Sequence, residues 1–326
     1  MLVKIIDINW SPELPIFASK NFLEAVSDQY GWLGGFNERG DLKCILPFTI
    51  IKKYFFKLAR FRVETIPIGP ELTPDEEKDF LNTVVHLLRK MKVDTIIPAT
   101  TNTIFRTYPD RAIVAPYGTF KIDLRQTEEE IWKEMSESHR RKIRQAEKNG
   151  VVIKSSLEFA EAAYNLIRET FKRSKLNFMK INDFSKYLKG LDEYVKIFVA
   201  EYQNSIQACV VIPFSQHSAY YVYGGSITTP ITGATNLLHW EAIRHFRNLG
   251  VRFYDFVGVR INPEKGSKQE GLYNYKERFG GKLYKGFIWK YYLNPISSMV
   301  YQLAVTILRK GDIVDAEKHK MKNCSA

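Results

Sequence analysis

Residues 87–99, LLRKMKVDTIIPA, and residues 245–258, HFRNLGVRFYDFVG, follow one pattern, and this pattern decides the fold class. In each stretch the end of an amphipathic helix is followed by a short turn and then by a hydrophobic strand. The two stretches occupy matching places in the two halves of the chain. A helix–turn–strand unit that recurs in this way indicates an internally duplicated α/β domain, each copy with a mixed sheet flanked by helices.

The sequence around these units predicts further elements of the same kind. In the first half we expect a helix over 16–30, strands over 32–36 and 41–51, a helix opened by Thr73-Pro74, and a strand over 93–99. In the second half we expect helices over 157–173 and 233–250 and strands over 151–156, 194–202, 206–214, 219–225, 251–258 and 282–293. Helices and strands therefore mix along both halves, as a duplicated α/β unit requires.

The segment between the two copies, residues 128–150 (EEEIWKEMSESHRRKIRQAEKNG), predicts one helix. Thr127 and Glu130 form a capping box at its start, and Asn149-Gly150 ends it. Its second half is strongly basic, with Arg140, Arg141, Lys142, Arg144 and Lys148. This charge order suits the helix dipole, so the segment is either a solvated helix or an anion-binding surface.

These elements predict two domains and a tail. Residues 1–149 form the first domain, which includes the basic helix, and residues 150–293 form the second, which holds the main site. The tail, residues 294–326, contains an amphipathic helix with Met299, Val300, Leu303 and Ile307 on one face. We expect this helix to pack back on the first copy, and a contact with lipid is the alternative.

The composition favours anionic partners. The 326 residues have a formal net charge of +12, which suits nucleic acid, phosphorylated metabolites or an acidic membrane surface. Cys44, Cys209 and Cys324 lie far apart without a CxxC spacing, so they predict neither a metal site nor a disulfide framework. With no secretory signal at Met1 and no spanning segment, we expect a cytoplasmic protein, and a peripheral contact at the inner face of the membrane stays open.

Several kinds of catalytic site are excluded by the motifs. The six histidines form no HExxH or related zinc-binding pattern, and His239 and His245 are six positions apart on one helix. Such a spacing does not place two ligands side by side. The sequence also lacks GxSxG, a GxxxxGK[ST] phosphate loop and a GxGxxG after a strand. We therefore predict no metal, no nucleotide cofactor of these types and no catalytic triad.

The first candidate site lies at residues 221–236, YVYGGSITTPITGATN. Here an aromatic strand that contains Tyr223 ends in two glycines, and a helix begins close to Asn236. Free backbone N–H groups at such a helix start can hold an anion. The alternative is a loop that needs glycine only for its backbone dihedrals.

The second candidate site is residues 271–281, GLYNYKERFGG. In a helix, Tyr273 and Lys276 would share a face, and the lysine could hold a phosphate or a developing oxyanion. The alternative is an ordinary exposed lysine. Asp255 is the most unusual acid, since it interrupts an apolar strand, and it is either a structural hydrogen-bond acceptor or a general base.

Three segments of the chain resemble the FemABX-like aminoacyltransferases, which build peptidoglycan cross-bridges. Residues 139–151, HRRKIRQAEKNGV, are similar to the basic helix of that family. Residues 233–259 resemble its long helix and following strand, and GLYNYKERFGG is similar to its aromatic–Lys–x–x–Phe–Gly signature. The resemblance implies two tandem domains of the GNAT acyltransferase type, each with a mixed twisted sheet. It covers nearly the whole chain in the order of elements.

The resemblance also implies an activity and its site residues. The expected reaction moves an aminoacyl or other acyl group onto an amine of a phosphate-bearing cell-wall precursor, without cofactor or metal. The donor would be aminoacyl-tRNA or another activated acyl compound, and the acceptor would be linked to a nucleotide or a lipid. Lys276 would be catalytic, stabilising charge on donor or acceptor, and the substrate-binding residues would be Arg140, Arg144, Arg278, Tyr223, Tyr273, Tyr275 and Asn236.

Two other functions remain open. The segment where acyl-CoA-dependent GNAT enzymes hold the CoA pyrophosphate would fall on Pro230–Thr235, and both ends of it depart from the usual residues. This departure favours a donor other than CoA, yet an acyl-CoA-dependent N-acyltransferase acting on an exopolysaccharide or sugar-nucleotide precursor is the first alternative. The second is a non-catalytic module that binds RNA or a membrane surface, since a fold does not by itself secure an activity.

Overall fold

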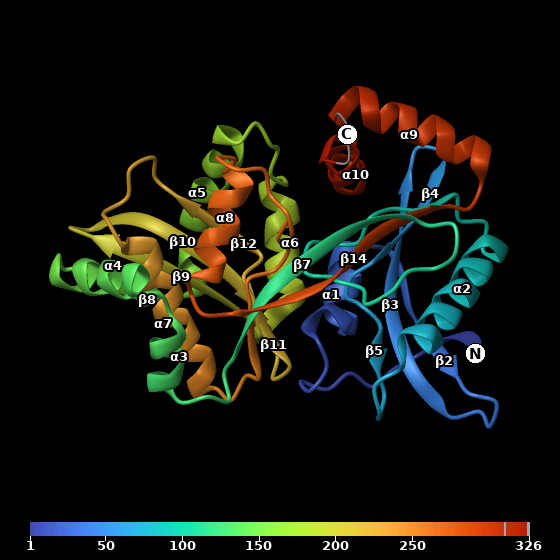
Figure 1. The fold of residues 1–326 in the computed structure, drawn as a ribbon, viewed down its shortest axis with the longest axis horizontal. Coiled ribbons are helices and arrows are strands. Elements are labelled where there is room, and N and C mark those ends of the chain that lie inside the picture. The colour runs from blue at the N-terminus through green and yellow to red at the C-terminus, as the bar shows by residue number, and fades with distance from the viewer. Residues whose placement is uncertain (310, 325–326) are drawn as a thin grey trace.

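The computed structural model describes residues 1–309 and 311–324, and within them the strands form one ten-stranded and one four-stranded sheet (Figure 1). The long sheet has the order β1-β2-β3-β4-β6-β14-β7-β13-β11, with β5 paired to β3. Its strands are β1 (Leu2–Ile6), β2 (Gln29–Phe36), β3 (Leu42–Lys53), β4 (Phe56–Phe61), β5 (Ile66–Pro67), β6 (Thr95–Ile96), β7 (Ile113–Asp123), β11 (Ser218–Tyr220), β13 (Phe253–Asp255) and β14 (Lys282–Tyr292). The small sheet has the order β12-β10-β9-β8 and consists of β8 (Val152–Ser155), β9 (Val195–Tyr202), β10 (Ser205–Pro213) and β12 (Tyr223–Ser226).

Helices flank both sheets. They are α1 (Lys20–Val26), α2 (Pro74–Lys90), α3 (Glu128–Glu134), α4 (Glu137–Lys148), α5 (Ala160–Arg173), α6 (Ile181–Leu191), α7 (Ala234–Asn248), α8 (Lys268–Glu277), α9 (Pro295–Arg309) and α10 (Ile313–Cys324), with short 3₁₀ turns at Ile16–Ala18, Leu157–Phe159 and Asp192–Tyr194. The α/β fold class is therefore as predicted. The strands of the second half, however, are divided between the two sheets.

The strands β7 and β14 join the two groups of elements that Figure 1 shows on its left and right. They pair antiparallel from Lys282↔Lys121 to Lys290↔Ile113. The far end of β14 continues onto β6 of the first half, whereas the end of β7 pairs with β13 of the second half. The final strand thus completes a sheet that belongs to both halves.

Two predicted helices are wrong in extent. The segment 128–150 is not one helix, because Met135 is extended (ψ 138°) and Ser136 starts a second helix by accepting a hydrogen bond from the backbone N–H of His139. The predicted helix over 16–30 is reduced to a 3₁₀ turn and α1, since Ser19 caps α1 and residues from Gln29 onward form β2. Serine caps, which satisfy free helical N–H groups, set both boundaries.

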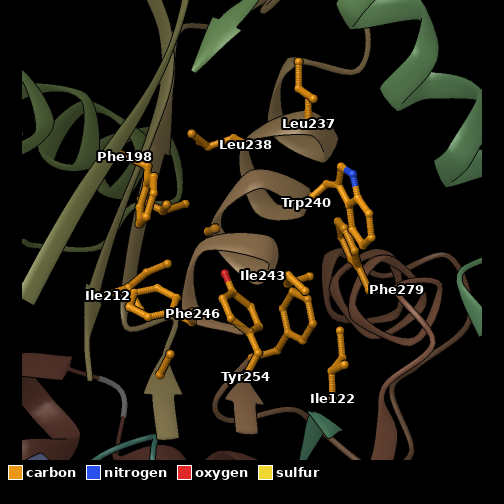
Figure 2. Packing of buried hydrophobic residues seen from close by; sticks show 14 of the residues in the cluster. Ile122, Phe198, Ile212, Leu237, Leu238, Trp240, Ile243, Phe246, Tyr254 and Phe279 are labelled. Atoms are coloured by element: carbon orange, nitrogen blue, oxygen red, sulfur yellow. The ribbon is translucent and has the colours of Figure 1, made fainter. Parts of the chain in front are cut away.

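The largest hydrophobic core surrounds α7, which lies between the small sheet and the end of the long one (Figure 2). Leu238 and Phe246 of α7 pack with Phe198 and Ile212 of the small sheet, and Ile122 and Phe279 close the cluster. Each fully buried side chain of this size contributes about 1.5–3 kcal/mol. The core therefore fixes the position of α7 relative to β12 and α8, which carry the candidate site.

The tail packs on β6, β7 and β14. Ser298 of α9 donates a hydrogen bond to the Asp94 carbonyl oxygen (2.9 Å) and lies 2.7 Å from the hydroxyl of Thr95. In α10, Val314 is buried against Ala115, Tyr117 and Ile288. The buried ammonium of Lys290 pairs with Asp312 (2.9 Å) and Asp315 (2.6 Å). None of the described helices is both long and apolar enough to traverse a lipid bilayer.

The close approach of α7 to α4 depends on Gly233. This residue has φ +84°, and a Cβ added there would collide with the carbonyl group of Lys142. Gly250 has a similar φ of +73° but open space around it. We predict that Gly250→Ala costs about 1 kcal/mol, for the backbone conformation alone. Gly233→Ala should cost at least about 2 kcal/mol more, because the helices must separate.

Urea unfolding of the two variants measures this difference. Equal losses of unfolding free energy would show that α4 and α7 are not held at the described distance.

Candidate functional site

Two cavities lie on either side of residues 221–226. The larger, of about 710 Å³, lies between the two halves and the tail, and its walls include Arg60, Arg62, Thr101, Tyr187, Tyr223 and Tyr301. The smaller, of about 260 Å³, lies between β12, α7 and α8, and it is lined by Cys209, Tyr221, Gly224, Thr235, His239 and Tyr275 among others. Since Tyr221 and Gly224 line one cavity and Tyr223 lines the other, this short segment separates two adjoining binding spaces.

A pair of arginines gives the large cavity its charge. Arg60 lies on β4 and Arg62 directly follows it, so the two side chains fall on the same face of an extended segment. Arg62 is only 7% exposed, and its Nε donates to the Thr49 hydroxyl (2.9 Å). Burial, and then the charge of Arg60, lower the pKa of Arg62 from its ordinary value.

The rest of the described lining carries little negative charge. Asp312 is the acidic residue among the described residues that line the cavity, and it already pairs with Lys290. Two adjacent guanidinium groups in a partly buried space are favoured when they bind an anion. The large cavity is therefore suited to a phosphate or carboxylate group.

Tyrosines form the opposite wall of the large cavity. The rings of Tyr187 and Tyr223 lie 5.7 Å apart at 68°. Burial raises the pKa of Tyr223 to about 12 and that of Tyr187 well above its usual 10, so both phenols stay neutral. The buried hydroxyl of Tyr187 has no hydrogen-bond partner within the described part of the chain. A bound ligand would supply one.

The small cavity is neutral and closely fitted. Gly225 passes the α5 backbone so closely that an added Cβ would lie 2.5 Å from the carbonyl carbon of Leu166. His239 is buried, its Nδ1 lies 2.8 Å from the Tyr254 hydroxyl, and desolvation lowers its pKa to about 3. Burial raises the pKa of the Cys209 thiol to about 12. Near neutral pH the lining therefore offers uncharged groups.

The structure brings together only some of the predicted site residues. Tyr223 lines the large cavity and Tyr275 the small one. Tyr273 packs edge-on against Phe120 with 5.0 Å between ring centroids. Asn236 is buried in α7, and its Nδ2 has no hydrogen-bond partner among the described residues.

The predicted phosphate-binding arginines line neither cavity: Arg144 and Arg278 are exposed, and Arg140 is half-buried. Arg140 donates to the Trp132 carbonyl oxygen (3.4 Å), and the guanidinium of Arg144 stacks over the Trp132 ring at 5.5 Å. Both therefore hold α4 against α3. Arg278 ends α8 and is exposed. The start of α7, which we expected to hold an anion, packs at Gly233 against the carbonyl group of Lys142.

Lys276 is buried and binds backbone. Its Nζ donates to the carbonyl oxygens of Val257 (2.7 Å) and Gly258 (2.8 Å). Val257 has φ +46°, which is strained for a β-branched residue, and the Gly258 N–H bonds to Thr101 O (2.8 Å) in the wall of the large cavity. In this arrangement Lys276 holds a strained segment behind the cavity.

Asp255 has the contacts of a structural acceptor. Its Oδ1 accepts hydrogen bonds from the Thr119 hydroxyl (2.5 Å) and the Val257 N–H (2.7 Å), and its Oδ2 lies 3.3 Å from Lys121 Nζ. The carboxylate is fully buried, and through Val257 it contacts the same strained segment that Lys276 holds. Of the two alternatives drawn from the sequence, the structural acceptor fits these contacts.

Arg60, Arg62 and Tyr187 were not identified from the sequence. The signal for the arginines was the run Ala59-Arg60-Phe61-Arg62, in which cations alternate with apolar residues as strand faces do. For Tyr187 no local signal exists, because its role follows only from the long-range approach of α6 to the first half.

Lys276 makes the stability of the protein depend on pH. Burial lowers its pKa in the folded protein from 10.5 to about 8, with a smaller opposing effect from Asp255. Between these values the unfolded chain binds the proton and the folded protein does not, so unfolding free energy rises with pH. We predict that the unfolding free energy of the native protein, relative to that of Lys276→Met, rises by about 2 kcal/mol between pH 7 and 10.

Urea unfolding at four pH values tests this prediction. Lys148→Met, at an exposed position of α4, is the matched control and should keep a constant difference from the native protein. A constant difference for Lys276→Met as well would contradict the burial of the ammonium group.

Comparisons with known proteins agree with this architecture. A model described as an acetyltransferase (GNAT) domain matches residues 133–277. The lipid II:glycine glycyltransferase of Staphylococcus saprophyticus is 27% identical over 114 residues, which span 33% of this chain and 28% of that protein. The corresponding protein of Staphylococcus epidermidis is 25% identical over the same length, covering 27% of its own chain. The chain thus spans little more than a quarter of these relatives.

Solved structures match over most of the chain. FemX has a TM-score of 0.63 at 15% identity, covering 89% of this chain and 94% of its own. The C-terminal domain of a lysylphosphatidylglycerol synthetase, described as putative, from Agrobacterium fabrum has a TM-score of 0.52 at 10% identity, with 88% and 91% covered. The predicted fold class and family resemblance are confirmed: this chain has the GNAT-like acyltransferase fold, its structure is similar to that of FemX, and a third of its sequence is distantly similar to the lipid II glycyltransferases.

Proposed function

We propose that the protein transfers an aminoacyl or other short acyl group from an activated donor to an amine on a phosphate-bearing cell-wall precursor. The observation that carries this proposal is the pair of adjoining cavities, one small and neutral, the other larger and cationic. An acyl transfer needs two substrates whose reacting atoms meet in a fixed orientation. Residues 221–226 lie where the two would meet.

The acyl group of the donor fits the small cavity. A volume of about 260 Å³ suits a short acyl chain or a small amino acid and excludes a whole nucleotide. The lining is neutral, because His239 and Tyr275 are both uncharged near neutral pH. A neutral lining suits the uncharged ester or thioester group of the donor. The remainder of the donor would extend outward over α8.

The acceptor fits the large cavity. Arg60 and Arg62 would bind its phosphate groups, and the hydroxyl of Tyr187 would donate to a further oxygen. Tyr223 would then face the region of the acceptor closest to the small cavity. This assignment moves phosphate binding from Arg140, Arg144 and Arg278, whose side chains line neither cavity, to the interior arginine pair.

The transfer would be direct, without an enzyme-bound intermediate. In this reaction the amine nitrogen bonds to the carbonyl carbon, the C–O or C–S bond of the ester or thioester breaks, and the proton lost by the amine ends on the hydroxyl or thiol of the departing donor. Burial raises the pKa of the Cys209 thiol to about 12, so the thiol stays protonated at neutral pH and is a poor nucleophile. Lys276 would act as a positioning residue that holds Val257 and Gly258 through their carbonyl oxygens. The family resemblance implies a different role, in which Lys276 stabilises charge on the donor or the acceptor.

The named relatives support the same reaction class. A lipid II:glycine glycyltransferase moves an amino acid onto a lipid-linked precursor, as its name states, and the match covers a third of the chain. Aminoacyl-tRNA as donor, a lipid- or nucleotide-linked acceptor and a cytoplasmic location belong to this proposal. The acetyltransferase model over residues 133–277 favours one alternative, an acyl-CoA donor.

Turnover with defined substrates tests the proposal. The purified protein would be incubated with aminoacyl-tRNA or acyl-CoA and with lipid-linked or nucleotide-linked muropeptides, and mass spectrometry would detect the new amide. Amide formation from aminoacyl-tRNA is the expected result, and Cys209→Ala should retain turnover. Transfer from acyl-CoA alone would establish the alternative donor. Transfer from neither, with salt-dependent RNA binding, would indicate the non-catalytic module.

Removal of the charge at Arg62 tests acceptor binding. We predict that Arg62→Gln weakens the binding of a nucleotide-linked acceptor by at least about tenfold, because a charge-assisted hydrogen bond contributes about 1.5–3 kcal/mol. Arg141→Gln, at an exposed position of α4, should leave the affinity unchanged. Isothermal titration calorimetry measures both. Equal affinities for the two variants would place the phosphate site elsewhere.

A further inference from the structure

The tail helix α9 exposes a stripe of large apolar residues on its outer side. The side of α9 that faces the protein includes Ser298 and Gln302, and Gln302 is bonded to Lys290 and Asp315. Its outer side exposes five large apolar residues: Ile296 (79% exposed), Met299 (71%), Val300 (46%), Leu303 (61%) and Ile307 (72%). These positions recur at the helical spacing and form one continuous stripe.

The tip of the β3–β4 hairpin extends this apolar surface. Tyr54 and Phe55 are 90% and 79% exposed at the tip. Phe55 stacks on Phe56 at 4.5 Å between ring centroids, and Phe56 contacts Tyr301 of α9 at 5.5 Å. The hairpin tip and α9 are thus joined by an aromatic chain. We call the exposed residues of both elements the apolar tail surface.

Positively charged residues beside the apolar tail surface favour an anionic partner. Lys52 and Lys53 immediately precede Tyr54 and are exposed. No acidic residue occurs in the sequence from Leu42 to Val63 or from Asn294 to Ile307. The segments that carry the apolar stripe thus have exposed lysines and no acids of their own, and they complement anionic lipid, whose headgroups attract lysine while its acyl region accepts the apolar side chains.

The geometry also fits a helix that lies flat on a bilayer. The 15 residues of α9 extend about 22 Å, too short to span the hydrocarbon core. The opposite side of the helix, through Tyr301 and Val305, lines the large cavity. A membrane under α9 would therefore lie next to the cavity that we assign to the acceptor.

We propose that the apolar tail surface is a docking site for an anionic phospholipid bilayer. Met299, Leu303 and Ile307 insert below the headgroups, with Tyr54 and Phe55 beside them, and Lys52 and Lys53 bind the anionic headgroups. The proposal goes beyond the transfer reaction and does not need it to be correct. If both hold, the acceptor can reach Arg60 and Arg62 while it stays anchored in lipid.

Co-sedimentation with vesicles tests the docking site without any substrate. The full chain should bind vesicles that contain phosphatidylglycerol and bind pure phosphatidylcholine at least about tenfold more weakly, since the lysine contribution requires anionic lipid. The triple variant Met299→Gln/Leu303→Gln/Ile307→Gln should lower the partition coefficient by at least about tenfold. Lys52→Gln/Lys53→Gln should weaken binding to anionic vesicles and reduce its dependence on salt.

A matched control uses apolar residues exposed elsewhere. Leu157 and Leu176 are 52% and 59% exposed in the second half, and Leu157→Gln/Leu176→Gln should bind vesicles as the native protein does. Thermal unfolding confirms that each variant is folded. Two results would overturn the proposal: absence of vesicle binding by the native protein, or self-association in ultracentrifugation that the triple variant abolishes, which would assign the surface to a second copy.

Discussion

The antiparallel ladder between β7 and β14 is the constraint on which the rest of the structure depends. Its nine residue pairs run from Lys282↔Lys121 to Lys290↔Ile113, and they join strands separated by more than 150 positions in sequence. One end extends onto β6 and the other onto β13. The two halves therefore share backbone hydrogen bonds, and the large cavity between them has a fixed shape. Independent domains on a flexible linker would not hold Arg62 opposite Tyr187.

A buried polar layer couples this ladder to the site. Lys121 lies on β7, pairs with Asp255, and is held next to Thr119, which donates to the same carboxylate. Asp255 in turn accepts the Val257 N–H, and the carbonyl group of Val257 accepts from Lys276. Removing one member would leave a buried charge or donor unpaired, which costs more than the bond itself contributes. The layer thus fixes the turn behind both cavities.

The sequence predicted what depends on local patterns. The Thr73-Pro74 start and apolar spacing of α2, the capping box at the start of α3 and the stripe of α7 are short-range signals, and the structure has all three helices. The strand β7 was missed because Pro116 and Gly118 interrupt it, and such residues normally argue against a strand interior. In the fold, β7 lies between β13 and β14, so its pairing comes from distant segments. The break at Met135 was missed because a serine inside a helical pattern gives no clear signal of a cap. Ser136 caps α4 only because Met135 is extended in the folded chain.

The same distinction explains the site. Lys276 and Tyr275 lie in a recognisable motif, but the lysine's contacts with Val257 and Gly258 follow from a turn 18 residues earlier. Arg60 and Arg62 lie far in sequence from Tyr187 and Tyr223, and only the fold brings these residues into the wall of one cavity. The tail adds a third long-range element, since Tyr301 and Val305 close the same cavity. The helix α9 and residues 311–313 thus complete a cavity whose positive charge comes from the first 62 residues. For this reason the two halves and the tail must fold together before the large cavity can form.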